Sequence, residues 1–164
     1  MNPRQIVFTM ALVEGIQLAR LVDDFRALVG PDRDVADPAL VRLTPTPYPE
    51  DDDAALSFAE STRDELLDRR VLDADTVRLA LTAFPVDTDS LTEDEALAPQ
   101  DVTVMEVDVD AWLRTLTAIR LVIAERLGIV SDDEHDAQDD RFGVYDWLGY
   151  RLEMLIQAAD DLDG

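Results

Sequence analysis

The sequence contains no cysteine and no lysine, and its one histidine is His135. Without cysteine, disulfides, thiolate metal sites and a cysteine nucleophile are excluded. All 14 basic residues are therefore arginines, and they oppose 37 acidic residues, which leaves a formal net charge of −23. Such a surface repels phosphates and anionic lipids, because their binding depends on lysine and arginine. We expect no direct binding of nucleic acid.

Long hydrophobic runs are also missing. The apolar runs extend over only a few residues, whereas a membrane-spanning helix needs about 20. The first residues lack the basic region and apolar stretch of a secretory signal. We therefore expect no contact with a membrane and a cytoplasmic location. A chain of 164 residues predicts one domain, residues 1–164, with a core of its own.

Sequence motifs for catalysis are missing as well. There is no glycine-rich phosphate loop, no Gly-x-Ser-x-Gly elbow and no Glu-x-x-His pair for a diiron bundle. The acidic run around His135 lacks the glycine and the closing glutamate of a calcium loop. Carboxylates are too numerous for the sequence to single out an acid–base pair. We predict no catalytic residue, no metal and no cofactor, and favour a non-enzymatic protein over an enzyme.

Hydrophobic periodicity predicts a mostly α-helical fold, a single-domain bundle of four to five helices. Apolar residues recur at helical spacing from about residue 11, and Gly30 followed by Pro31 ends this first helix. A short helical turn is expected over 37–43, where Pro38 occupies a first position that tolerates proline.

The middle of the chain is predicted to hold two helices with a break between them. The first runs over 52–70, with Leu56 and Leu67 on its buried face. A break at 72–73 then allows an aspartate to cap the next helix, which Pro85 ends.

A small two-stranded β-ribbon is predicted from two stretches rich in β-branched residues, 5–9 and 102–107. Between the helices and the second strand, residues 86–100 are acidic and bracketed by prolines. Loops of this length are either functional or disordered. The acidic composition favours a mobile surface loop.

Two amphipathic helices near the C-terminus are predicted to pack antiparallel and to organise the core. The first runs from about Asp110 to Gly128, which ends it, and the second covers 142–162. Gly149 costs about 1 kcal/mol in a helix interior relative to alanine. This cost predicts that another helix approaches closely at Gly149.

The candidate site residues lie on these two helices. Arg120 falls within an apolar stripe, and a buried arginine needs a partner. Asp146, flanked by Tyr145 and Trp147, is the candidate counter-ion, and the alternative is that Arg120 extends to solvent. A third alternative is an anion or partner site in which Arg120, Arg126 and Tyr145 cooperate.

Several stretches resemble an actinobacterial family of domains of unknown function. They are Tyr145-Asp-Trp-Leu-Gly followed by an aromatic residue, Trp112-Leu-Arg, and Arg126-Leu-Gly-Ile. The chain departs from the family at Thr117 and Ala118, where members commonly carry Asn-Asp. The resemblance covers most of the chain. It implies a small intracellular protein, often encoded beside ClpS, the adaptor that delivers substrates to the Clp protease, and it implies no established activity.

Together these observations predict a non-enzymatic interaction or regulatory protein, and the resemblance adds a link to Clp-dependent proteolysis. We expect a protein partner, whose identity the sequence does not give, and a homodimer is left open. One rival is an acidic decoy that occupies a nucleic-acid-binding protein, which requires carboxylates along one face. The other is a small enzyme or ligand-binding domain with an arginine-lined anion pocket.

Overall fold

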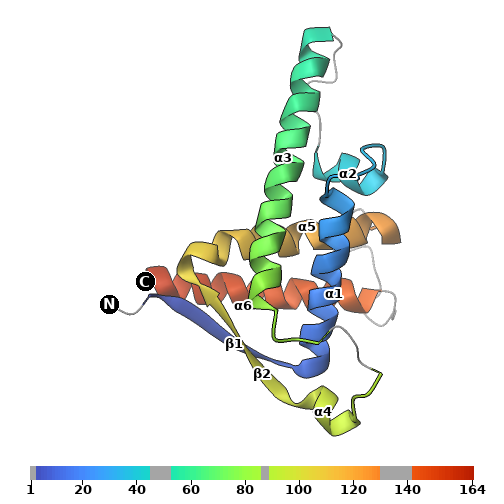
Figure 1. The fold of residues 1–164 in the computed structure, drawn as a ribbon. Coiled ribbons are helices and arrows are strands. Elements are labelled where there is room, and N and C mark those ends of the chain that lie inside the picture. Colours follow the sequence, from blue (N-terminus) through green and yellow to red (C-terminus); the bar gives the residue numbers. More distant parts are fainter. Residues whose placement is uncertain (1–2, 45–52, 86–88, 130–141) are drawn as a thin grey trace.

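The computed structural model of the protein describes residues 3–44, 53–85, 89–129 and 142–164. Within them the chain is mostly helical with one two-stranded ribbon, as predicted (Figure 1). In chain order the elements are β1 (Gln5–Ala11), α1 (Leu12–Val29), α2 (Pro38–Leu43), α3 (Asp53–Ala80), α4 (Glu93–Leu97), β2 (Pro99–Met105), the 3₁₀ turn η1 (Glu106–Asp108), α5 (Val109–Leu127) and α6 (Gly143–Asp163).

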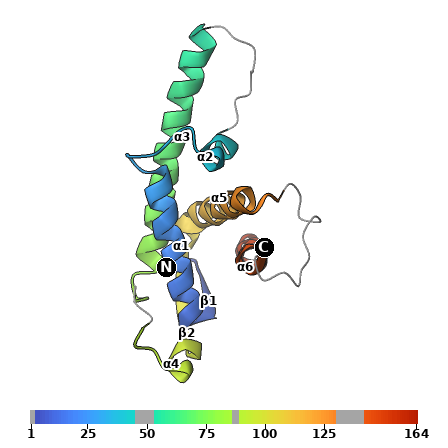
Figure 2. The same cartoon turned by 90° about the vertical axis from the view of Figure 1, so that its right-hand side faces the viewer.

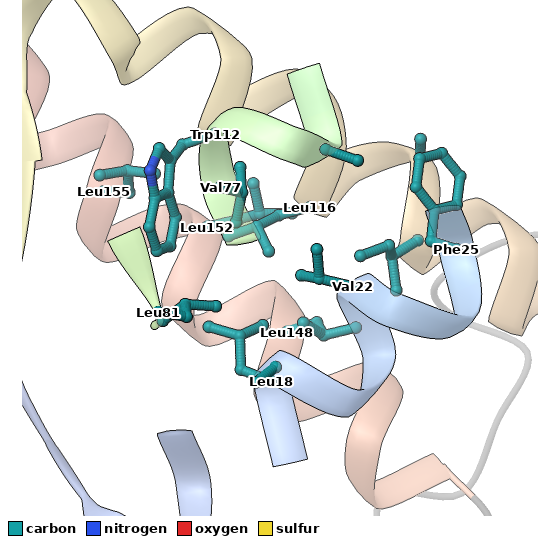
Figure 3. Packing of buried hydrophobic residues seen from close by; sticks show 14 of the residues in the cluster. Leu18, Val22, Phe25, Val77, Leu81, Trp112, Leu116, Leu148, Leu152 and Leu155 are labelled. Atoms are coloured by element: carbon teal, nitrogen blue, oxygen red, sulfur yellow. The ribbon is translucent and has the colours of Figure 1, made fainter. Parts of the chain in front are cut away.

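The core forms where α1, α3, α5 and α6 meet. Helices α5 and α6 pack on each other and run in opposite directions, as the shared apolar stripe predicts (Figure 1). Side chains from all four helices enclose Leu148, which is 0% exposed (Figure 3). Trp112 and Leu116 enter this cluster from α5, and Val22 enters it from α1. The C-terminal pair therefore forms one side of the core, which α1 and α3 complete.

The ribbon is confirmed and is longer than predicted. Strands β1 and β2 are antiparallel, with Gln5 opposite Met105 and Ala11 opposite Pro99. Side chains alternate between the core and the outside, so Ile6 and Met10 are buried on β1. The predicted extension of the second strand to residue 107 is wrong, because 106–108 form η1, which leads directly into α5.

The predicted break at 72–73 is wrong, because α3 is one continuous helix. Its buried side chains, Leu67, Ala74 and Val77, keep one helical face against the core through this region. The Asp73 carboxylate caps no helix; it accepts hydrogen bonds of 2.8 and 3.1 Å from Arg114 of α5. Continuous packing and the absence of a proline or glycine allow the helix to run on.

The predicted loop over 86–100 contains regular structure. Residues 86–88 lie outside the described residues, but α4 and the start of β2 fall within the predicted loop. Thr92 caps α4 by accepting a hydrogen bond from the Glu95 amide at 3.2 Å. Helix α4 buries no side chain. The prediction is therefore right about the surface position and wrong about the irregular backbone.

At the far end of the molecule, α3 projects beyond the body. A helix of 28 residues is about 42 Å long, and its N-terminal half extends past the other helices, with α2 beside it (Figures 1 and 2). Across the described ranges, neither α3 nor another helix is both long and apolar enough to cross a membrane.

Candidate functional site

Arg120 and Tyr145 lie against each other at the junction of α5 and α6. Arg120 donates a hydrogen bond from Nε to the Tyr145 carbonyl at 3.1 Å, and its guanidinium carbon stands 3.8 Å from the centre of the tyrosine ring. This is a cation–π contact. The guanidinium also lies beside Gly149, where an added Cβ would stand 2.9 Å from Nη2. The helix predicted to approach Gly149 is α5, which reaches it through the Arg120 side chain.

Arg126 is directed elsewhere, to the start of α2. Its Nη1 and Nη2 donate two hydrogen bonds of 2.7 Å to the two carboxylate oxygens of Asp37. Asp37 also caps α2 by accepting a bond from the Ala39 amide at 2.9 Å. The bidentate pair therefore connects the C-terminal end of α5 to the first turn of α2.

Trp147 belongs to a third cluster, which connects α6 to α1. Its Nε1 donates to Glu14 Oε2 at 2.8 Å, and Arg151 Nη2 donates to the same oxygen at 2.6 Å. Burial raises the pKa of Glu14, but the hydrogen bonds from Arg151 and Trp147 outweigh burial and hold this pKa below its ordinary value. The pairing of Arg120 with Asp146 stays a prediction.

The predicted site residues thus take part in separate contacts. Arg120 and Tyr145 are together, whereas Arg126 binds Asp37 and Trp147 binds Glu14. A shallow hollow that Arg126 lines is otherwise built from side chains of α1 and α5, and neither Arg120 nor Tyr145 lines it. The anion site formed by these residues stays a prediction.

The Asp37–Arg126 pair gives a prediction for pH. The hydrogen bonds from Arg126 and from the Ala39 amide hold the pKa of Asp37 below its ordinary value. A lowered pKa in the folded state adds stability above the unfolded pKa of about 4, and this stability is lost as the pH falls through the folded-state pKa. Asp37→Asn keeps a good capping residue. The variant should lose about 1 kcal/mol of unfolding free energy at pH 7 and less towards pH 2.

Urea denaturation of the variant and the wild type, followed by circular dichroism from pH 7 to pH 2, measures this difference. Subtracting the two profiles cancels the general effect of neutralising a chain of charge −23. Asp34→Asn is the control, because the Asp34 carboxylate accepts a hydrogen bond from the Ala36 amide and lies, like Asp37, in the connection between α1 and α2. A difference between wild type and Asp37→Asn that does not change with pH would contradict the prediction.

A different region has the features of an interaction surface. Along the projecting half of α3, none of the side chains described from Asp53 to Leu66 is buried. Two of these side chains are large and apolar: Phe58 is 75% exposed and Leu56 is 46% exposed. The predicted burial of Leu56 is therefore wrong, because α2, the described element beside this part of the helix, leaves Leu56 exposed.

Helix α2 and the connection before it complete this surface. Val35, Val41 and the projecting part of α3 border a shallow hollow of about 430 Å³. We name its apolar lining the α2–α3 face, which consists of Val35, Val41, Leu56, Phe58, Ala59 and Leu66. Glu60, Thr62 and Arg63 are the polar residues that α3 adds to the rim.

Arg33 holds α3 in this position. Its side chain is 13% exposed and donates hydrogen bonds to the Val29 carbonyl at 3.1 Å and to the Asp68 carboxylate at 2.9 Å. A longer bond of 3.4 Å reaches Asp64. Because Arg33 connects the end of α1 to the middle of α3, the projecting half starts from an anchored base.

Sequence reasoning missed the α2–α3 face. Phe58 lies off the apolar stripe that contains Leu56 and Leu67. Its position outside the stripe is the feature of the sequence that could have predicted an exposed aromatic side chain. The acidic loop around His135 lies outside the described residues. Within the ranges that the structure describes, no group of three or more histidine, cysteine, aspartate or glutamate residues is arranged to hold a metal ion.

Comparison with known proteins gives one match. The family model described as "Domain of unknown function (DUF2017)" matches residues 1–159. Searches of curated proteins and of solved structures returned no match. The match covers nearly the whole chain, including Tyr145 to Tyr150 of α6. The resemblance to a family of domains of unknown function is thereby confirmed, and the chain belongs to the DUF2017 family.

Proposed function

We propose that this protein is a non-enzymatic interaction protein that binds a partner protein through the α2–α3 face. The observation that carries the proposal is the projecting half of α3, which exposes Phe58 and Leu56 while burying none of its described side chains. A helical segment that buries no described side chain gains little from packing, and helices without packing are only marginally stable in water. A partner that covers this face would supply the missing burial.

The chemistry of the face defines the kind of partner. Apolar side chains form its centre, and acidic side chains such as Glu60 and Asp64 lie along the same helix segment. The whole chain carries a formal charge of −23. A second copy would bring an equal negative charge, which opposes association. A partner segment with apolar side chains flanked by arginine or lysine complements both the apolar centre of the face and the negative charge around it.

The first partner to test is the Clp system. The family resemblance implies a gene beside the one for ClpS, and this setting is the reason for the choice. In this proposal the protein acts as a cytoplasmic regulator that occupies ClpS or a Clp subunit. The assignment rests on association alone, so its failure would remove the Clp link and leave the α2–α3 face to be tested with other partners.

Phe58→Asp is expected to weaken partner binding at least tenfold, because interface energy concentrates in a few buried aromatic anchors. The measurement is titration calorimetry of wild type and variant against purified ClpS and Clp subunits. Leu79→Asp is the matched control, because Leu79 is equally exposed at 76% on the other half of α3. It should bind as the wild type does.

Two further outcomes decide between the proposal and its rivals. If none of the Clp proteins binds, affinity capture from native lysate is repeated with wild type, Phe58→Asp and Leu79→Asp, and the proposal requires a partner that only Phe58→Asp loses. Identical capture by all three contradicts it. Light scattering at low and high salt tests the homodimer, which high salt would favour by screening the repulsion. The acidic decoy and the anion pocket stay predictions.

A further inference from the structure

A cavity lies between β1 and α6, on a different side of the molecule from the α2–α3 face. Its volume is about 150 Å³. Ile6 and Phe8 of β1, Leu116 of α5, and Leu148 and Leu155 of α6 are among the apolar residues that line it. Val7 and Met154 also line it and are themselves partly exposed, at 52% and 41%. The cavity is therefore formed by the core and reaches the surface beside these two side chains.

One wall of the cavity carries a buried hydrogen-bond donor. The indole of Trp112 is 1% exposed, and among the residues that the structure describes its buried Nε1 has no hydrogen-bond partner. In Figure 3 the indole nitrogen lies on the side of the ring that faces Leu155, and both residues line the cavity. A buried N–H without a partner costs about 1–3 kcal/mol. An acceptor inside the cavity would remove this cost.

The second polar group on the wall is already neutralised. Arg151 lines the cavity, and its Nη2 forms a 2.6 Å ion pair with Glu14, while Nη1 donates to the Thr9 carbonyl at 3.4 Å. Of the three guanidinium nitrogens of Arg151, Nε is the one that is buried without a hydrogen-bond partner in the described part of the chain. Because Glu14 balances the charge of Arg151 and the whole chain is strongly acidic, the cavity favours a neutral acceptor over an anion.

A single water molecule suits this cavity poorly. Buried waters typically make about three hydrogen bonds, whereas cavities with apolar linings stay dry. Apart from Trp112 and Arg151, the lining side chains are those of apolar residues. A cavity of about 150 Å³ with apolar walls admits a molecule of the size of benzene.

We infer that this cavity is a binding site for a small neutral molecule with an apolar ring or chain and one acceptor oxygen, such as a ketone. The apolar part occupies the space between β1 and α6. The oxygen accepts the hydrogen bond of Trp112 Nε1. This site is independent of the α2–α3 face.

Two probes of nearly equal shape test the inference, cyclohexanone and methylenecyclohexane, which replaces the ketone oxygen with a CH₂ group. Each is titrated into the full-length ¹⁵N-labelled protein, and the two indole N–H resonances, of Trp112 and Trp147, are followed by NMR. Cyclohexanone should bind with a dissociation constant of about 1 mM. It should shift the Trp112 resonance downfield through the new hydrogen bond, whereas methylenecyclohexane should not. The Trp147 resonance is the internal control, because its N–H is bound to Glu14.

Two variants test separately the hydrogen bond from Trp112 Nε1 and the volume of the cavity. Trp112→Phe removes the N–H and should weaken cyclohexanone binding about tenfold, with little effect on methylenecyclohexane. Ala158→Leu fills the cavity from the partly exposed side of α6 and should abolish the binding of both probes in a folded protein. The inference is overturned if cyclohexanone leaves the Trp112 resonance unmoved, if Trp112→Phe weakens both probes equally, or if Ala158→Leu binds them as the wild type does.

Discussion

Leu148→Ala is expected to lower the free energy of unfolding by about 3 to 5 kcal/mol. Leu148 is 0% exposed and lies where α1, α5 and α6 meet (Figure 3). Truncation to alanine removes buried methyl groups and leaves a cavity whose cost rises with its volume. Here the new space joins the existing cavity, which Leu148 lines. We therefore expect the loss of unfolding free energy to lie in the upper part of the range of about 3 to 5 kcal/mol. Urea denaturation followed by circular dichroism measures it.

The control for this prediction is Leu79→Ala. Leu79 is the same residue type in a helix, but it is 76% exposed. The change should move the unfolding free energy by less than about 0.5 kcal/mol. Similar losses in both variants would contradict the position of Leu148 inside the core.

Gly15→Ala is expected to destabilise the fold by about 2 to 3 kcal/mol. A Cβ built on Gly15 would stand 1.9 Å from Cε1 of Phe84. Phe84 is a buried aromatic ring, 5% exposed, so it has little room to move. Gly15 lies in the first turn of α1, and Phe84 lies four residues after the end of α3 at Ala80. A helix interior normally gains from glycine-to-alanine exchange, so the expected loss has the opposite sign to the helix propensity.

A double variant tests the cause of this loss. Phe84→Leu should recover part of the stability in the presence of Gly15→Ala, because it removes the ring atoms that the new methyl group meets. Gly143→Ala is the matched control, because in the described part of the chain no atom beyond its chain neighbours and its own helix backbone lies within 4 Å of its Cβ position. It should be neutral or slightly stabilising. Additive effects of Gly15→Ala and Phe84→Leu would contradict the proposed clash.

The helices with one continuous apolar face were predictable from the sequence. Local periodicity and end signals are enough for α1 and α5, which end before Gly30 and Gly128, and periodicity alone is enough for α6, because each helix buries a single stripe. Gly128 illustrates this point, since its φ of 72° is the left-handed conformation that favours glycine at a helix end. Likewise, the β-branched stretches identified the ribbon before its register was known.

The tertiary structure decided what depended on residues far apart in the chain. The sequence offers 14 arginines and 37 acidic residues, and local patterns do not tell which of them meet. Arg126 therefore had no visible link to Asp37, which lies 89 positions away.

The same reason explains the misjudged half of α3. Its stripe at Leu56 resembles a buried face locally, but burial requires another element to reach it, and the helix projects past the body. Local patterns in the sequence predict most of the helices and their apolar faces, but they predict neither α4 nor the continuity of α3. Which of those faces the chain covers depends on the tertiary structure, because covering a face requires contacts between distant segments.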